Sequence, residues 1–164
     1  MQYENEVEKP ERRHSKRVGR ELAMQYLFQC DLTGEKFSPD TWTAFWEQAA
    51  AEHELGDNRH GRKCREYAEK LLDACVRDAD KIAETIRSLA RNWDPERIST
   101  VDRSILKVAI AEMYNFPDVP PVVSIDEAVA ITRDYSDERA CDFVNGILNS
   151  VKGTLGRPER EGVR

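Results

Sequence analysis

The sequence predicts an all-α protein of about seven helices, arranged as two packed helical bundles. Apolar residues recur with a period near 3.6 in each long segment, as they do in amphipathic helices. Serine, a residue type that caps helix N-termini, begins three of these segments. No stretch of useful length alternates between apolar and polar residues, and only residues 120–125 are briefly strand-like.

Four helices are expected in the N-terminal half, at about 16–32, 38–56, 62–77 and 79–91. Gly34 is expected to end the first helix, because glycine readily adopts the left-handed conformation that follows many helices. Ser38 and Pro39 begin the second helix, since serine caps a helix and proline suits its first turn. The turn NWDPER, at 92–97, follows the fourth.

Three more helices are expected in the C-terminal half, from Ser99 to the loop FPDVPP at 116–121, from Ser124 to about Asp134, and from about Tyr135 to Val151. Ser99 and Asp102 have the spacing of a capping box, with aspartate in place of the preferred glutamate. Ser124 and Glu127 form a second box. The helix after Ser99 is apolar around most of its circumference, which places it at the centre of the fold.

The chain is expected to hold one helical domain at 15–152, with sub-bundles at about 15–91 and 98–152. Residues 1–14 are polar and rich in charge, and residues 153–164 are polar. This composition predicts a flexible arm before the domain and a flexible tail after it.

Composition indicates an intracellular protein. The four cysteines contain no CxxC pair, and three of them sit among apolar residues, which favours free thiols in a reducing compartment. No apolar run approaches the ~20 residues of a membrane span, and the N-terminus lacks the apolar core of a signal peptide. We therefore expect a cytoplasmic location and no contact with a membrane.

Motifs for catalysis or metal binding are missing from the sequence. His60 and Cys64 are four residues apart and could share a helix face, but nothing nearby supplies further zinc ligands at a convincing spacing. No nucleophile-elbow, P-loop or dinucleotide motif occurs. The acidic pair at 137–138 is explained by its place at a helix N-terminus. We expect no enzyme activity, no metal site and no cofactor.

A basic cluster stands out in a chain whose net charge is −6. The stretch RRHSKRVGR holds five cations in nine residues and no acid, namely Arg12, Arg13, Lys16, Arg17 and Arg20. Such clusters bind nucleic-acid phosphates and release counterions. A solvated tail explains a basic run equally well, but an amphipathic helix follows directly and would hold Arg17 and Arg20 in place.

Three aromatic residues are candidates for stacking on unpaired RNA bases: Phe28, Tyr135 and Phe143. Aromatic side chains belong more often to the core, and that alternative stays open for each of them. Phe143 lies in the segment DFVNGIL, where Gly146 would let a neighbouring helix approach closely. Asn145 would bond a backbone group at that crossing, and Phe143 would point outward towards RNA.

Three segments resemble the NusB family of transcription antitermination factors: RVGRELAMQYLFQ, STVDRSILKVAIAEM and VPPVVSIDEAVAITRDYSDERACDFVNGILNSV. The similarity covers about Arg12 to Val151. The resemblance implies an all-helical fold of two bundles, without catalysis or cofactor. It also implies pairing with NusE, a small-subunit ribosomal protein. The heterodimer would bind single-stranded boxA RNA in nascent transcripts, within the RNA polymerase antitermination complex, and support ribosomal RNA synthesis.

The resemblance also assigns residues. RNA contacts would come from Arg12, Arg13, Lys16, Arg17, Phe28, Tyr135, Arg139 and Phe143. Arg139 stands where some relatives carry an acid. The acidic start of the central helix faces NusE in such proteins, and Asp102 would take that part here.

Two alternatives keep this fold and change the function. NusB-like domains also occur as accessory modules fused to RNA methyltransferases, but no catalytic domain follows here. A structural interaction module or a homodimer that hides the basic surface, without boxA binding, is the other possibility.

Overall fold

The computed structural model describes residues 14–93 and 98–156, and these residues confirm the all-α prediction. The helices are α1 (Ser15–Thr33), α2 (Pro39–Glu52), α3 (Arg59–Arg77), α4 (Ala79–Leu89), the 3-10 turn η1 (Ala90–Asn92), α5 (Thr100–Asn115), α6 (Pro121–Tyr135) and α7 (Glu138–Thr154). The described part of the chain contains no β-strand.

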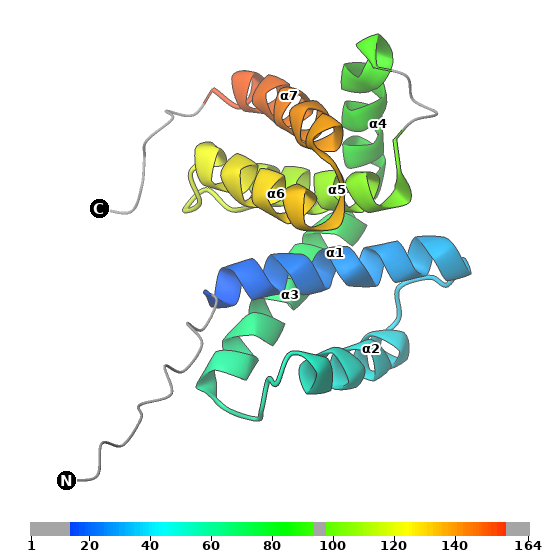
Figure 1. Ribbon diagram of the computed structural model, residues 1–164, viewed down its shortest axis with the longest axis vertical. Helices are drawn as coiled ribbons and strands as arrows, with labels where there is room; N and C mark the ends of the chain where they lie inside the picture. Colours follow the sequence, from blue (N-terminus) through cyan, green and yellow to red (C-terminus); the bar gives the residue numbers. More distant parts are fainter. Residues whose placement is uncertain (1–13, 94–97, 157–164) are drawn as a thin grey trace, which may run out of the picture.

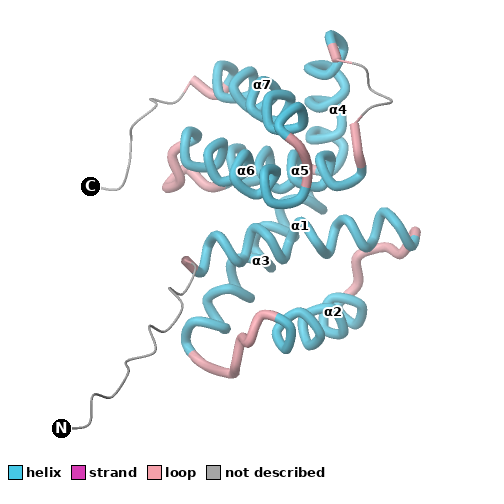
Figure 2. Tube along the Cα trace, viewed as in Figure 1, coloured by secondary structure: helices cyan, strands magenta, loops and turns pink. Residues whose placement is uncertain are grey.

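The helices form two layers in Figure 1. One layer holds α1, α2 and α3, and the other holds α4 to α7 (Figures 1 and 2). Helix α1 packs against α3 within its own layer and against α5 across the boundary. Helix α4 packs against α5 and α7, so in space it joins the C-terminal bundle. Helix α4 also contacts α3, and the predicted sub-bundles at about 15–91 and 98–152 stay a prediction.

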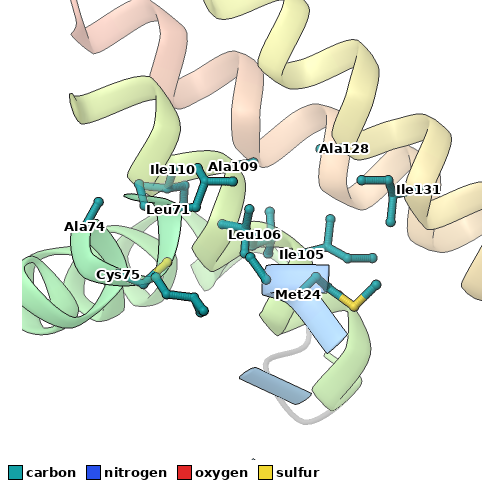
Figure 3. Close-up of a cluster of buried hydrophobic side chains, with 14 of the residues drawn as sticks. Met24, Leu71, Ala74, Cys75, Ile105, Leu106, Ala109, Ile110, Ala128 and Ile131 are labelled. Atoms are coloured by element: carbon teal, nitrogen blue, oxygen red, sulfur yellow. The ribbon is translucent and has the colours of Figure 1, made fainter. Parts of the chain in front are cut away.

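The core is continuous across both layers. Leu71 of α3 lies among Ile105, Leu106 and Ile110 of α5, as Figure 3 shows. Met24 of α1 joins the same cluster. Helix α5 is buried along most of its length, which confirms its predicted central place. Burial of these apolar side chains holds the two bundles together, because helices of both bundles pack against α5.

Helix α6 begins at Pro121, three residues before the predicted capping box. Pro121 takes the first turn, where proline costs no hydrogen bond. Ser124 is therefore inside the helix and buried, and its hydroxyl donates to Glu112 Oε1 at 2.6 Å. The predicted capping box at Ser124 is wrong, because the serine bonds across the fold to α5.

Gly19 sets the distance between α1 and α3. A Cβ atom at this position would lie 3.0 Å from Tyr67 Cβ and 3.1 Å from the Cys64 carbonyl oxygen. These contacts are tighter than a side chain normally allows, so the two helices can cross this closely only where the side chain is absent.

Candidate functional site

A groove lies where the starts of α5 and α7 meet the end of η1. Its volume is about 470 Å³. The residues that line it are Asn92, Trp93, Ile98, Ser99, Asp102, Ser136, Asp137, Arg139, Ala140 and Phe143. We call it the α5–α7 groove. It brings together Asp102, Arg139 and Phe143, three of the residues that the sequence selected.

Asp102 presents a carboxylate to this groove. Its backbone N–H donates to Ser99 Oγ at 3.1 Å, which confirms Ser99 as the cap of α5. The side chain is only 6% exposed, and its Oδ1 atom has no hydrogen-bond partner among the described residues. A buried carboxylate without a partner is costly, so the geometry favours a site that an external donor completes.

Phe143 does not point outward. It is 7% exposed and shares one face of α7 with the buried Val144 and Ile147. Its ring meets Trp93 edge to face, with ring centroids 5.2 Å apart. The prediction of an outward ring is therefore wrong, because the apolar stripe of α7 includes Phe143. Trp93 covers it and is itself 41% exposed, so Trp93 is the accessible ring of the groove.

The neighbouring residues of α7 also differ from expectation. Trp93 Cζ2 would lie 3.5 Å from a Cβ atom at Gly146, so this glycine faces an indole ring and not a closely packed helix. Asn145 is exposed, and its carbonyl and side-chain oxygens accept from Asn149 Nδ2 at 2.9 and 3.1 Å. Neither residue takes the predicted part, because Gly146 faces the Trp93 side chain and Asn145 is exposed and bonds within α7.

Tyr135 connects the groove to α1. It is 43% exposed, and its hydroxyl accepts a 2.6 Å hydrogen bond from Gln25 Nε2. The next two residues of the chain, Ser136 and Asp137, line the groove. Phe28 is half-buried and follows Gln25 by three positions on α1, so the two side chains are neighbours on that helix. Gln25 thus links Tyr135 to the part of α1 that carries Phe28.

The cations of α1 have different surroundings. Arg17 Nε lies 3.2 Å from Glu21 Oε1, and its terminal nitrogens lie 3.0 Å from Glu127 and 3.6 Å from Asp134. Three carboxylates thus surround one guanidinium, which leaves Arg17 little attraction for an RNA phosphate. Lys16 is exposed, with its ammonium 5.7 Å from the centre of the Tyr67 ring. Arg12 and Arg13 lie outside the described residues.

Arg20 belongs to a buried cluster that joins four helices. Its Nε atom donates to Glu112 of α5 at 2.8 and 3.1 Å. Tyr67 of α3 and Ser124 of α6 donate to the same carboxylate. Burial and the negative charge of Glu112 raise the pKa of the Tyr67 phenol, which keeps its proton on the donor. We call this set the Glu112 cluster, and its role is to hold the fold.

Ligands for a metal ion do not gather in the described ranges, where no group of three or more suitable side chains occurs. His60 Nε2 lies 3.7 Å from the buried thiol of Cys64, without a further ligand beside them. Among residues 14–93 and 98–156, no helix combines the length and apolarity that crossing a bilayer requires.

A family model described as the NusB family matches residues 17–152. The chain belongs to the NusB family. The transcription antitermination protein NusB of Bacillus cereus (strain B4264) is 39% identical over 140 residues, which cover 85% of this chain and 98% of that protein. The NusB protein of Bacillus thuringiensis (strain Al Hakam) matches to the same extent, with 39% identity over 85% of this chain and 98% of its own length.

Solved NusB structures share the fold. A crystal structure of the antitermination factors NusB and NusE in complex with double-stranded RNA matches with a TM-score of 0.70 and 25% identity, over 86% of this chain and 98% of that chain. The T. maritima NusB structure matches with a TM-score of 0.65 and 26% identity, over 85% of this chain and 91% of that chain. NusB proteins are RNA-binding antitermination factors and not enzymes, in agreement with the sequence prediction.

Trp93 lines the α5–α7 groove, but it is not among the residues that the sequence selected as candidates for RNA stacking. It was assigned to the turn NWDPER, although an aromatic residue beside an Asp-Pro turn stands at the end of a helix, where a ring is easily left half exposed. This position in the sequence could have indicated that Trp93 is exposed. Nothing in the sequence indicated that Trp93 packs on Phe143, because the two residues are fifty positions apart.

Proposed function

We propose that this NusB-family chain pairs with NusE and that the heterodimer binds boxA RNA in nascent transcripts. It would act in the cytoplasm, within the RNA polymerase antitermination complex, and support ribosomal RNA transcription. The observation that carries this proposal is the α5–α7 groove, where an exposed cation and an exposed ring meet a buried carboxylate whose Oδ1 has no partner among the described residues. The solved neighbour that holds NusB with NusE and RNA supports it.

The groove and α1 would both contact RNA, through rings that stack on bases and cations that neutralise phosphates. Trp93 and Tyr135 offer exposed rings on which unpaired bases can stack. Phe28 follows Gln25, the partner of Tyr135, on α1, and the Phe143 ring packs against Trp93 edge to face. Arg139 and Lys16, together with Arg12 and Arg13 of the arm, would neutralise phosphates. Arg17 is bound by carboxylates and is left out of this role.

Asp102 would receive a cationic side chain of NusE. A guanidinium or ammonium group supplies the hydrogen bond that Oδ1 lacks and balances the buried negative charge. Since the whole chain carries a net charge of −6, RNA is repelled from most of its surface. The partner would therefore supply part of the RNA surface and much of the specificity.

Titration of labelled boxA RNA with this chain, alone and with purified NusE, tests the proposal. We expect clearly tighter binding in the presence of NusE, and a preference for boxA over a scrambled strand of equal length. Equal affinity with and without NusE, or for both strands, would contradict it. Light scattering of the same samples separates a heterodimer from a homodimer.

Replacing Trp93 by leucine is expected to weaken boxA binding by about 5- to 150-fold, because stacking one base contributes about 1–3 kcal/mol. Trp93→Phe keeps a ring and should retain most of the affinity. The measurement is fluorescence anisotropy with NusE in excess. If Trp93→Leu and Trp93→Phe bind RNA equally well, stacking on this residue is refuted.

A further inference from the structure

A second group of cations stands beside Lys16, on α3. Arg59 and Lys63 are exposed and four residues apart, and Tyr67 follows four residues later on the same strip of the helix. The Lys16 ammonium lies over that same Tyr67 ring. The close crossing at Gly19, against Cys64 and Tyr67, fixes the start of α1 next to this strip. Figure 1 shows the first turns of α1 and α3 on the same side of the molecule.

The nearby acidic residues do not neutralise this group. Asp57 pairs with Arg62 at 3.4 Å, and Glu66 pairs with Lys70 at 3.1 Å. Within the described residues, neither Arg59 nor Lys63 forms an ion pair. We name Lys16, Arg59 and Lys63 the basic strip. It differs from Arg17, whose charge is already balanced inside the protein.

The basic strip is placed where it does not help the fold. The first turns of α1 and α3 contain no acidic residue, and Lys16 and Arg59, which lie in them, oppose the positive end of the helix dipole; Lys63 follows directly after the first turn of α3. The side chains of His14 and Asn58 cap the two helices, so the cations are not needed as caps. These cations destabilise the helix starts, and they are concentrated on one face of an acidic protein. This combination indicates that the face binds a strongly negative ligand.

Helix α1 leads from the strip towards the groove. Lys16 lies in its first turn, and Gln25, which binds Tyr135, lies nine residues further on. This separation is roughly 14 Å along the helix axis, but nine residues make about two and a half turns, so Lys16 and Gln25 project from opposite sides of α1. A strand whose bases stack at Trp93 and Tyr135 would therefore reach α3 by passing around the start of α1.

We propose that the basic strip binds phosphates of the same RNA strand that occupies the α5–α7 groove, and so extends the RNA footprint onto the N-terminal bundle. The inference rests on the proposed RNA-binding function. It adds Arg59 and Lys63 of α3 to the RNA surface and gives them a contact to the sugar-phosphate backbone that is independent of base sequence.

The test is the double variant Arg59→Gln/Lys63→Gln, compared with Lys81→Gln/Arg87→Gln on α4. The second variant removes the same charge from another helix, where both residues are exposed. RNA affinity is measured with NusE in excess, between about 50 and 200 mM salt. We expect the α3 variant to flatten the slope of log K against log salt by about 1.4, or 0.7 for each lost phosphate. The α4 variant should keep the wild-type slope.

RNA length provides a second readout. Adding about eight uridines to either end of boxA should increase wild-type affinity at one end, and the α3 variant should lose that gain. Thermal unfolding of the α3 variant should be unchanged or slightly higher, because cations have been removed from a helix N-terminus. Weaker RNA binding then cannot be ascribed to unfolding.

The outcomes separate the two proposals. An unchanged salt slope in the α3 variant, while Trp93→Leu still weakens binding, overturns the basic strip and leaves the function standing. Loss of NusE pairing without a change in the RNA salt slope also overturns it, because the strip would then be a protein contact. A wild-type chain that binds no RNA with NusE present overturns both.

Discussion

Replacement of Glu112 by alanine lowers the free energy of unfolding by about 3–5 kcal/mol, the expected cost of breaking a buried ion pair. Glu112 is 1% exposed and accepts hydrogen bonds from Arg20, Tyr67 and Ser124. The substitution removes the hydrogen-bonded carboxylate of the buried Arg20 guanidinium and leaves it the longer 3.6 Å contact to Glu127. It also removes the point at which α1, α3, α5 and α6 are joined. Urea unfolding followed by circular dichroism measures the change.

A compensated variant shows whether the cost comes from the unpaired charge. Arg20→Leu/Glu112→Leu replaces the pair with apolar side chains and should recover much of the lost stability, since such replacements are often close to neutral. The exposed Asp126→Asn of α6 serves as a surface control and should change stability by no more than about 0.5 kcal/mol. A loss below about 1 kcal/mol in Glu112→Ala would show that the Glu112 cluster contributes little.

Asp102→Asn is expected to weaken pairing with NusE by about 2–5 kcal/mol, or roughly 30-fold or more. The substitution preserves shape and removes the charge that a partner cation would meet. The free energy of unfolding should stay constant or rise, because the variant no longer buries a charged oxygen, Oδ1, that has no hydrogen-bond partner among the described residues. Isothermal titration with NusE and urea unfolding give the two values.

Asp126→Asn again provides the matched control, because it makes the same change of charge at an exposed position of α6. It should leave NusE affinity within about twofold of wild type. If Asp102→Asn pairs with NusE as tightly as Asp126→Asn does, Asp102 is not part of the partner site. A stability loss without loss of affinity would instead assign the carboxylate to the fold.

Local pattern was sufficient to predict that the described chain is helical and to predict the caps at Ser38 and Ser99, but not the N-caps of α1 and α3 or the start of α6. Ser38, Ser99 and Asp137 cap helices as serine and aspartate commonly do, and the apolar period gave the buried face of α5. The start of α6 was missed because two valines after two prolines resemble a strand, while the neighbouring helices that bury Ser124 and Ile125 are distant in sequence.

The site was less predictable, because long-range partners decide it. Arg17 lies in the basic cluster that predicts RNA contacts, but its guanidinium forms an ion pair with Glu127, 110 residues away in sequence. Arg20 is taken by Glu112, 92 residues away. The sequence selected Phe143 as an outward ring, but Phe143 is buried and Trp93 is the more exposed ring of the pair, and this difference depends on the packing of Trp93 on α7. Spacing within one helix contains no information about these pairings.

The missing side chain at Gly19 has a further consequence for recognition. It lets α1 cross α3 closely beside Cys64 and Tyr67. Lys16 and Gln25, which binds Tyr135, belong to this one helix, so the helix itself fixes the spacing between the charge and the ring. Under the proposed function, a strand would meet groups whose spacing is already set, and this part of the protein would lose little conformational entropy on binding.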